Sequence, residues 1–575
     1  MTLFFRPTEP GSSTSPARSV NWGYAAGGIA TIWLVLLIAM PVGVIIITSF
    51  YNEGFTLANY RDFASSASLL RATANSLTVS MGIALLSLLI GGTLAFGVAR
   101  TQMRFKTLVR TAMIIALISP EFLLAMGYIL LAGPNAGYFN VALRAFFSLP
   151  QTSGPLNVFT LFGLILTALP NGVAYVFLTM APAFSNMDPA LEEAARMKGA
   201  TAFGAVRDIT VPLMRPAMLS GALLAFATSL AMFGPPQMLG INVLTVAIRN
   251  ALINLDFSLA AVAAIVLVGL SVVALLIQRL SVRHGERYRT LGGKSFRART
   301  IDVGAGTHAL SALGLFYALM ALVVPYGGML TASLMKSIGN GFTAGNWTVE
   351  NYVVIFTDHA IFRAVMLSFS LAAASATIVV LTGIVVAYVV LRTRLPGRSI
   401  LDYLSVMPLA IPGTALAFAL VVAYLNWPLN LLGFYGTPAI LLVAYLARYV
   451  PIGVRNCQSS LLQIAAELEE ASRVFSAGEF KTVWNITIPL ILPSIIYTWI
   501  LVFILAVPEL SSSIVLRGFG TQTVSTALLG IWSGNGGLAV ASAFGISLFI
   551  LVGSLFGAAA IILKRSGKLK GLQLG

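Results

Sequence analysis

Long apolar segments alternate with short polar ones along the whole chain. Several apolar segments approach the roughly 20 residues that an α-helix needs to cross the hydrocarbon core of a bilayer. Because lipid offers the backbone no hydrogen-bond partner, such segments are predicted to be transmembrane helices. They are twelve in number and lie near residues 22–50, 73–99, 108–132, 159–182, 213–232, 256–279, 308–335, 364–391, 400–425, 438–460, 489–507 and 539–563.

A polar linker at 280–306 divides these segments into two sets of six. We expect an all-α polytopic membrane protein of about 12 transmembrane helices, with a first repeat at 22–279 and a second at 307–563. Residues 1–21 and 564–575 are expected to form polar tails. The first apolar run is too long for a signal-peptide core, so we expect an uncleaved first helix.

The composition supports this class and argues against others. Of 575 residues, 58% are hydrophobic and 9% charged, and the mean hydropathy of +0.90 is far above that of soluble domains. The formal charge of +16 would suggest nucleic-acid binding in a soluble protein, but most Lys and Arg residues lie in short loops, so no nucleic-acid partner is expected. The single Cys457 excludes an intrachain disulfide, and three scattered His residues make no metal-ligand spacing.

The positive charges predict the orientation in the membrane, because loops rich in Lys and Arg usually face the cytoplasm. The opposite-side loops, 133–158 and 426–437, are nearly free of these residues. Both termini are therefore expected to be cytoplasmic. The positive residues of the linker, the second loop, the matching loop of the second repeat and the C-terminal tail are Arg283, Arg287, Arg289, Lys294, Arg297, Arg299, Arg100, Arg104, Lys106, Arg110, Arg392, Arg394, Arg398, Lys564, Arg565, Lys568 and Lys570.

One polar loop occurs in both repeats, at 188–212 and 465–489. The sequence LEEAARMKGATAFGAVRDITVP in the first corresponds without a gap to LEEASRVFSAGEFKTVWNITIP in the second. TLANYRDF also corresponds to TVENYVVIF, and TANSLTVS to AVMLSFSLA. Two halves of one topology are parallel repeats, for which a pseudo-two-fold axis along the membrane normal is expected. The aligned loop pairs include Glu193 with Glu470, Ala194 with Ala471, Ile209 with Ile486 and Pro212 with Pro489.

Each loop is predicted to form two short helices joined by a bend at a small residue, Gly199 or Ser476. In the first copy one helix side is small and apolar, and Glu192 and Arg196 can face outward. Such a surface suits docking into a groove of another protein. A helix lying in the membrane interface has a similar pattern, but duplication at matching places disfavours that alternative. The residues that recur on this side at three- and four-residue spacing are Leu191, Ala194, Ala195 and Lys198.

The duplicated loop resembles the EAA loop of inner-membrane permeases in binding-protein-dependent ABC importers. The resemblance implies that the loop is a coupling helix seated in a cytoplasmic ATPase subunit. The second copy departs from the pattern at two positions, where serine replaces alanine and glycine. The matching residues are Glu193, Ala194, Ala195, Gly199, Ile209 and Pro212 in the first copy, and Glu470, Ala471, Ser472, Ser476, Ile486 and Pro489 in the second.

The resemblance covers roughly the whole chain and implies a type I importer permease in a bacterial inner membrane. The segments AMFGPPQMLG, at 231–240, and VPELSSSIVLRGFGTQTVSTALL, at 507–529, are most similar to fused permeases for ferric iron. Thiamine, 2-aminoethylphosphonate and polyamine cargoes remain open. The implied partners are two copies of an ATP-binding subunit, which would hold ATP and Mg, a periplasmic or extracellular solute-binding protein, and membrane lipid.

The chain itself is not expected to be an enzyme or to bind a cofactor. TLGGKS, at 290–295, is close to a phosphate-binding P-loop, but the first required Gly is replaced by Tyr288. The spans contain no His cluster, Ser/His pair or acidic metal motif, so no catalytic or metal-binding residue is predicted. A secondary transporter remains an alternative, although it gives no reason for duplicated polar loops.

Two acids, Glu121 and Glu509, directly follow prolines at or near the ends of apolar spans. Ionisable groups within a membrane often serve function, so one hypothesis is that both carboxylates face the translocation path and help to admit a cationic or metal-bearing solute. The alternative is an interfacial or structurally paired position. Arg249 and Arg517 are expected on the outer side as interface anchors or contacts for anionic groups, and His359 as a lone surface residue.

Overall fold

The computed structural model describes residues 22–51, 54–150, 154–188, 190–199, 201–285, 301, 303–474, 479–534 and 537–565. Within these residues the chain is built from helices. Among the described residues, ten helices are long and apolar enough to cross a membrane, or up to 12 if each of two bent pairs is one span. This confirms the expected all-α membrane fold.

The first repeat contains six spans or span equivalents. They are formed by α1 (Trp22–Leu34), η1 (Val35–Ala39) and α2 (Met40–Ser49); α4 (Ala67–Arg100); α5 (Lys106–Ile118) with α6 (Glu121–Ala132); α8 (Leu161–Ser185); α11 (Val211–Leu230); and α14 (Phe257–Gly285).

The second repeat follows the same order. Its spans are formed by α15 (Gly306–Ala318), η4 (Leu319–Val323) and α16 (Val324–Ser333); α18 (His359–Arg392); α19 (Arg398–Val406) and η7 (Met407–Ala410) with α20 (Gly413–Leu425); α21 (Pro438–Leu461); α24 (Ile488–Ala506); and α27 (Leu538–Arg565).

Short helices connect the spans. Those away from the duplicated loops are α3 (Ala58–Ser65), α7 (Tyr138–Phe147), α12 (Gly234–Met238), α13 (Leu244–Ile253), η5 (Ile338–Asn340), η6 (Ala344–Asn346), α17 (Glu350–Thr357), η8 (Leu429–Leu432), α25 (Ser513–Leu516) and α26 (Val524–Ser533).

The third span of each repeat is broken. The predicted spans at 108–132 and 400–425 are instead bent pairs, with an angle of 105° between α5 and α6 and of 114° between α20 and the segment formed by α19 and η7. Pro120 and Pro412 stand at the breaks with extended backbone, because proline cannot donate the helical hydrogen bond. Such a break is tolerated in a membrane where it is buried in protein or lines a cavity.

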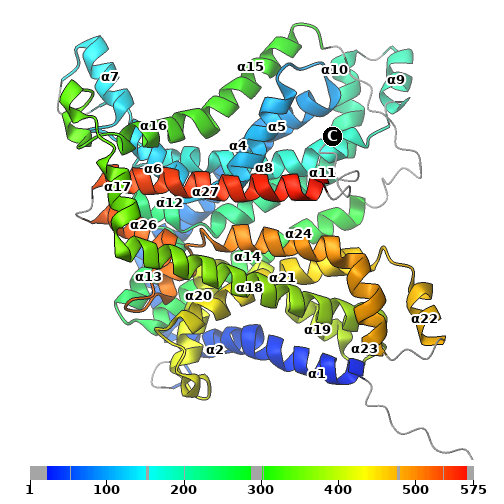
Figure 1. Ribbon diagram of the computed structural model, residues 1–575. Helices are drawn as coiled ribbons and strands as arrows, with labels where there is room; N and C mark the ends of the chain where they lie inside the picture. The colour runs from blue at the N-terminus through cyan, green and yellow to red at the C-terminus, as the bar shows by residue number, and fades with distance from the viewer. Residues whose placement is uncertain are drawn as a thin grey trace, which may run out of the picture.

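The first span of each repeat packs on the opposite repeat. α1 contacts α18 and α19, whereas α15 contacts α4 and α5. In Figure 1, α1 and α2 accordingly lie beside α18 to α21, and α15 and α16 lie beside α4 to α6. The two halves are therefore interlocked rather than placed side by side.

Each repeat has a tightly packed helix pair at its centre, α4 with α8 and α18 with α21. A Cβ atom at Gly383 would lie 2.7 Å from the backbone of Gly453, and one at Gly91 would lie 2.8 Å from the carbonyl oxygen of Val173. Small residues let membrane helices approach closely, which replaces the hydrophobic driving force that lipid does not provide.

The sequence echoes between the repeats correspond to repeated hydrogen bonds. The Asn59 amide donates to the carbonyls of Ser49 and Tyr51, as Asn351 does to those of Ser333 and Met335. The Ser76 hydroxyl accepts from the amide of Leu244, as Ser368 does from that of Val524. The duplication therefore extends to the internal contacts of each half.

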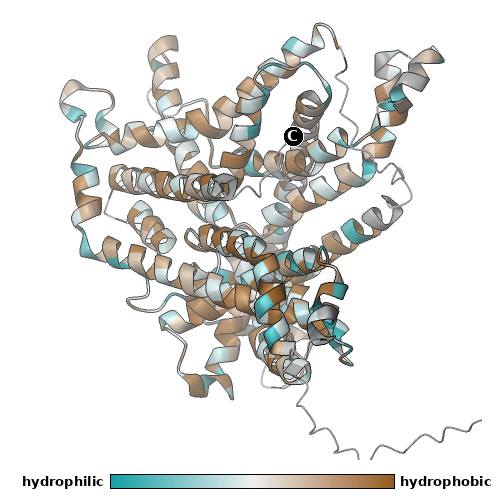
Figure 2. Cartoon of the chain, turned by 45° about the vertical axis from the view of Figure 1, so that its right-hand side comes forward, coloured by the Kyte–Doolittle hydropathy of each residue, from teal (hydrophilic) through white to brown (hydrophobic). Residues whose placement is uncertain are grey.

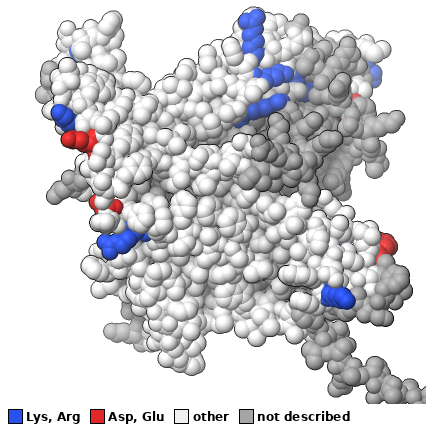
Figure 3. Space-filling view, in the orientation of Figure 1, with Lys and Arg blue, Asp and Glu red and all other residues white. Residues whose placement is uncertain are grey.

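The surface is consistent with a membrane environment. Apolar residues predominate along the long helices in Figure 2. On the face shown in Figure 3, charged side chains gather toward the two ends of the spans and leave a broad uncharged band between them.

Candidate functional site

The first duplicated loop contains α9 (Ala190–Met197) and α10 (Ala202–Ala205). Gly199 between them has a φ of +89°, a conformation that glycine adopts without the steric penalty of a side chain. The five-residue π-helix η2 (Val206–Thr210) follows and runs directly into α11. The predicted pair of short helices joined by a glycine bend is confirmed in this copy.

The second loop contains α22 (Ala466–Val474), α23 (Glu479–Thr482) and the π-helix η9 (Val483–Thr487), which runs into α24. The half-buried Ser472 has its hydroxyl 3.0 Å from that of Thr482, so α22 and α23 are joined by a side-chain contact. Ser476 lies outside the described residues, and its bend stays a prediction.

The outer face of the loops remains the predicted docking surface. Glu470 and Gly199 are exposed and Ala195 is half-buried. The side chains of Glu193, Ala194 and Ala471 lie outside what the structure describes.

Glu192 is not on the outer face, and its predicted outward position is wrong. Its carboxylate is buried, with Oε2 2.5 Å from Nη2 of Arg100 and Oε1 accepting a 2.6 Å hydrogen bond from the Thr210 hydroxyl. Arg100 is the last residue of α4 and has a fully buried side chain. A cation held inside the protein therefore draws the carboxylate inward. We call Arg100, Glu192 and Thr210 the first carboxylate cluster.

The second repeat has a corresponding group of residues. We call Arg392, Glu469 and Thr487 the second carboxylate cluster. Oε2 of Glu469 lies 3.3 Å from Nε of Arg392, and Oε1 accepts a 3.0 Å hydrogen bond from Thr487. Arg392 is the last residue of α18. The exposed fractions of the Arg392 and Glu469 side chains are 13% and 2%.

Two sequence features could have predicted these clusters. Both loops contain two consecutive glutamates, and both second spans end on an arginine. We attributed Arg100 and Arg392 to membrane orientation alone. The structure shows that both also hold the duplicated loops.

Glu509 has partners within the protein. The carboxylate accepts hydrogen bonds of 3.0 and 3.1 Å from the amide of Ser512 and of 3.1 Å from that of Ser513, and it lies 3.8 Å from Nη1 of Arg448. Only 3% of its side chain is exposed. This geometry favours the structurally paired alternative for Glu509.

Glu121 is half-buried and is the first residue of α6, directly after the break in the third span. Gly413 has the corresponding position in the second repeat, after Pro412 at the start of α20. A Cβ atom at Gly413 would lie 1.9 Å from Nη1 of Arg448. Arg448, whose side chain is 35% exposed, therefore fills the space that a side chain at Gly413 would need, and it interacts electrostatically with Glu121 of the other repeat.

The sequence did not single out Arg448. Its side chain lies on α21 of the second repeat, and Tyr175 on α8 of the first repeat interacts electrostatically with both Arg448 and Glu121. The two halves thus contribute opposite charges to one polar region at the broken spans.

Two arginines come together outside this region. Arg249 on α13 is half-buried and Arg517, which follows α25, is exposed, and the two are close enough to interact electrostatically. The exposed His359 begins α18 behind the helix cap formed by Asp358.

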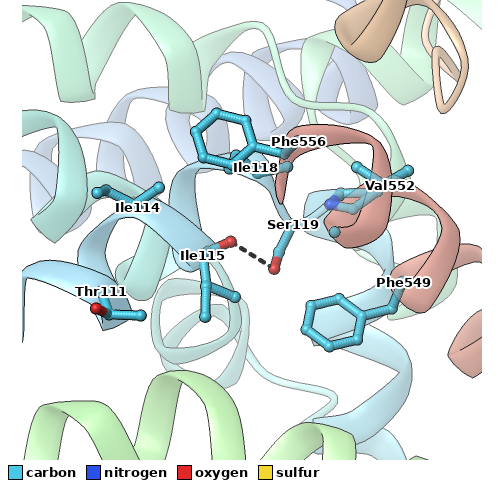
Figure 4. Close-up of a pocket in the computed structure, with 10 residues that line it drawn as sticks. Thr111, Ile114, Ile115, Ile118, Ser119, Phe549, Val552 and Phe556 are labelled. Carbon is cyan, nitrogen blue, oxygen red and sulfur yellow. Dashed lines mark hydrogen bonds between the residues drawn. The ribbon is translucent and has the colours of Figure 1, made fainter. Parts of the chain in front are cut away.

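An apolar cavity of about 290 Å³ lies between α5 and α27 at the break in the third span. Figure 4 shows isoleucine and phenylalanine side chains around it, with the Ser119 hydroxyl donating to the carbonyl of Ile115. The lining has no charged side chain. Within the described part of the chain, no three His, Cys, Asp or Glu residues are grouped to hold a metal ion. The TLGGKS segment lies outside the described residues.

The duplicated loops, broken third spans and interlocked halves define a membrane permease built from two repeats. The chain belongs to the family described as the binding-protein-dependent transport system inner membrane component, which matches residues 87–285 and 379–561. It is therefore an ABC importer permease that carries its permease unit twice.

Its relatives include permeases with different cargoes. The ferric transport system permease protein FbpB of Actinobacillus pleuropneumoniae is 26% identical over 546 residues, covering 92% of this chain and 77% of that protein. The putative ferric transport system permease protein FbpB 1 of Haemophilus influenzae is 26% identical over 498 residues, covering 84% and 76%. A probable molybdenum ABC transporter permease of Haloferax volcanii is 29% identical over 246 residues, covering 42% and 85%.

Proposed function

We propose that this chain forms the membrane path of an ATP-driven importer for ferric iron. Ferric iron is supported as the cargo by the similarity to two ferric permeases along 92% and 84% of the chain, which includes both repeats. The molybdenum permease, in contrast, aligns with only 42% of this chain. A solute-binding protein would deliver the iron on the outer side, where the Arg249 and Arg517 pair provides positive charge for acidic groups of that protein.

Two cytoplasmic ATP-binding subunits would each hold one duplicated loop, α9 with α10 or α22 with α23. ATP and Mg would be held by those subunits. The exposed position of Glu470 and the glycine bend beside α9 support this docking role. The loops, the linker and both termini would then lie in the cytoplasm of a bacterial cell, with ATP binding shifting the permease between inward-open and outward-open states.

The polar region at the broken spans would form part of the path. Glu121 is the better candidate of the two predicted acids, because it is half-buried and forms no ion pair within 4 Å among the described residues, whereas the Glu509 carboxylate is held by Arg448 and backbone amides. A carboxylate is a suitable oxygen ligand for a ferric ion in transit, and Arg448 would limit how strongly the ion is retained.

The cargo is tested by stimulation of ATP hydrolysis. The permease is purified with the ATP-binding subunits that co-purify with it, reconstituted in liposomes and supplied with the solute-binding protein of the same system. That protein is loaded in turn with ferric iron, 2-aminoethylphosphonate, thiamine or putrescine. Stimulation of ATP hydrolysis by the ferric form alone supports the proposal. Stimulation by the form loaded with another solute would show that this solute, and not ferric iron, is the cargo.

The docking role has its own test. Glu193→Lys together with Glu470→Lys is expected to reduce the co-purified ATP-binding subunits, whereas Glu350→Lys on α17 keeps them. Full retention of the ATP-binding subunits and of coupled hydrolysis in the double variant would refute docking by these residues. Accumulation of solute without any ATPase partner would instead indicate a secondary transporter.

A further inference from the structure

The two carboxylate clusters have the same construction although the repeats differ in sequence. In each, a glutamate on the first loop helix meets an arginine at the C-terminal end of the second span and a threonine at the end of a π-helix. The loop helix, the second span and the start of the fifth span therefore converge on one carboxylate.

The arginines extend the connection to the fourth span. Arg392 donates through Nη2 to the carbonyls of Leu461, at the end of α21, and Ile464, at distances of 3.0 and 2.8 Å. Arg100 lies 3.4 Å from the carbonyl of Met187, just beyond α8. Each guanidinium thus joins the ends of two spans to the loop between the fourth and fifth spans.

Stability alone is a weak reason for such a cluster. Removing two charges from water costs several kcal/mol per ion, so a buried pair is often no more stable than apolar residues of similar volume. What the pair provides is a fixed geometry, because the planar guanidinium and the carboxylate leave few ways of satisfying each other. The same set of partners in both repeats indicates that a fixed position of the loop is the useful property.

The π-helices suggest where movement of the loop is received. η2 and η9 occupy corresponding places, and each continues without interruption into a membrane span. Their last residues, Thr210 and Thr487, bind the buried carboxylates. Single-turn π segments within helices often occur at functional sites.

We propose that Glu192 and Glu469 are positioning residues that fix each coupling loop to the ends of the second and fifth spans, so that loop and spans move as one body. The proposal rests on the proposed importer role of the loops.

A distance measurement tests the rigid attachment without reference to the cargo. Cysteines replace the exposed Gln102, which follows α4, and the exposed Met197, at the end of α9, in a Cys457→Ala background. Spin labels on these sites are measured by pulsed electron resonance in the permease reconstituted with its ATP-binding subunits, with and without ATP.

The same narrow distance distribution is expected in both states, and Glu192→Gln is expected to broaden it. Lys198→Gln, an exposed change one residue beyond α9, serves as the matched control and leaves it unchanged. A wild-type distance that changes with ATP, or a Glu192→Gln distribution identical to wild type, would overturn the proposal.

A second readout separates positioning from folding. Complexes carrying Glu192→Gln or Glu469→Gln are compared for ATP hydrolysis and for ferric iron transported per ATP. Hydrolysis is expected to persist while transport per ATP falls at least tenfold for either variant, and Glu467→Gln on the exposed side of α22 is the control. Unchanged transport per ATP in both variants refutes the positioning role. If wild type hydrolyses ATP but moves no iron, the cargo assignment fails while the distance result still decides the inference.

Discussion

The first carboxylate cluster makes a quantitative prediction about stability. In Arg100→Met the Glu192 carboxylate, 5% exposed, keeps the Thr210 hydroxyl but loses its only counter-charge among the described residues. Removing one partner of a buried ion pair typically costs about 3–5 kcal/mol, because the remaining charge stays desolvated. We expect a loss in this range for Arg100→Met.

The double variant Arg100→Met with Glu192→Met is expected to recover most of that loss, because apolar residues of similar volume often replace a buried pair at little cost. The free energy of unfolding is measured in detergent micelles by titration with a denaturing detergent. Arg207→Met is the control: Arg207 pairs with Asp208 at 3.8 Å with side chains 77% and 74% exposed, so no measurable change is expected. A loss below 1 kcal/mol for Arg100→Met, or a double variant less stable than both single variants, would refute the reasoning.

Three further predictions concern other parts of the chain. Gly383→Val should cost about 1–3 kcal/mol in the same titration, because its Cβ meets the Gly453 backbone at 2.7 Å; a neutral result would mean that α18 and α21 can separate freely. Gly199→Ala should destabilise the first loop by about 1–2 kcal/mol through its φ of +89° alone, seen as faster amide exchange in α9, and unchanged exchange would argue against the bend. Glu121→Gln should reduce ferric uptake with the complex intact, whereas Glu509→Gln should reduce the amount of folded protein, since Arg448 loses its partner. Equal uptake by Glu121→Gln and wild type would remove Glu121 from the path.

Hydropathy and self-similarity were sufficient for the architecture. A segment of about 20 apolar residues crosses the bilayer as an α-helix, because lipid offers the backbone no hydrogen-bond partner. The ungapped match between the two loops identified the repeat. The interlocking of the halves could not be read in this way. Lipid-facing and protein-facing sides of a membrane helix are equally apolar, so nothing in the sequence of α1 indicates that it packs on α18 and α19.

The polar sites were predicted less well, because the partner of a buried charge is distant in sequence. Helical spacing left Glu192 free to face outward, and only the fold shows Arg100, 92 residues away, beside it. Glu121 and Glu509 were recognised as unusual from their position alone. Their surroundings differ because of Arg448. Nothing in the sequence around Arg448 marks this residue as part of a site.

The proposed function of this permease is import of ferric iron driven by ATP hydrolysis. The direct measurement is accumulation of radioactive ferric iron in liposomes containing the permease and its ATP-binding subunits, with iron-loaded binding protein on the side opposite the duplicated loops and ATP on the side of the loops. We predict accumulation that requires both ATP and the binding protein and is lost when a non-hydrolysable ATP analogue replaces ATP. ATP hydrolysis stimulated by the loaded binding protein with no iron entering the liposomes, or iron entry at the same rate without ATP, would contradict the account.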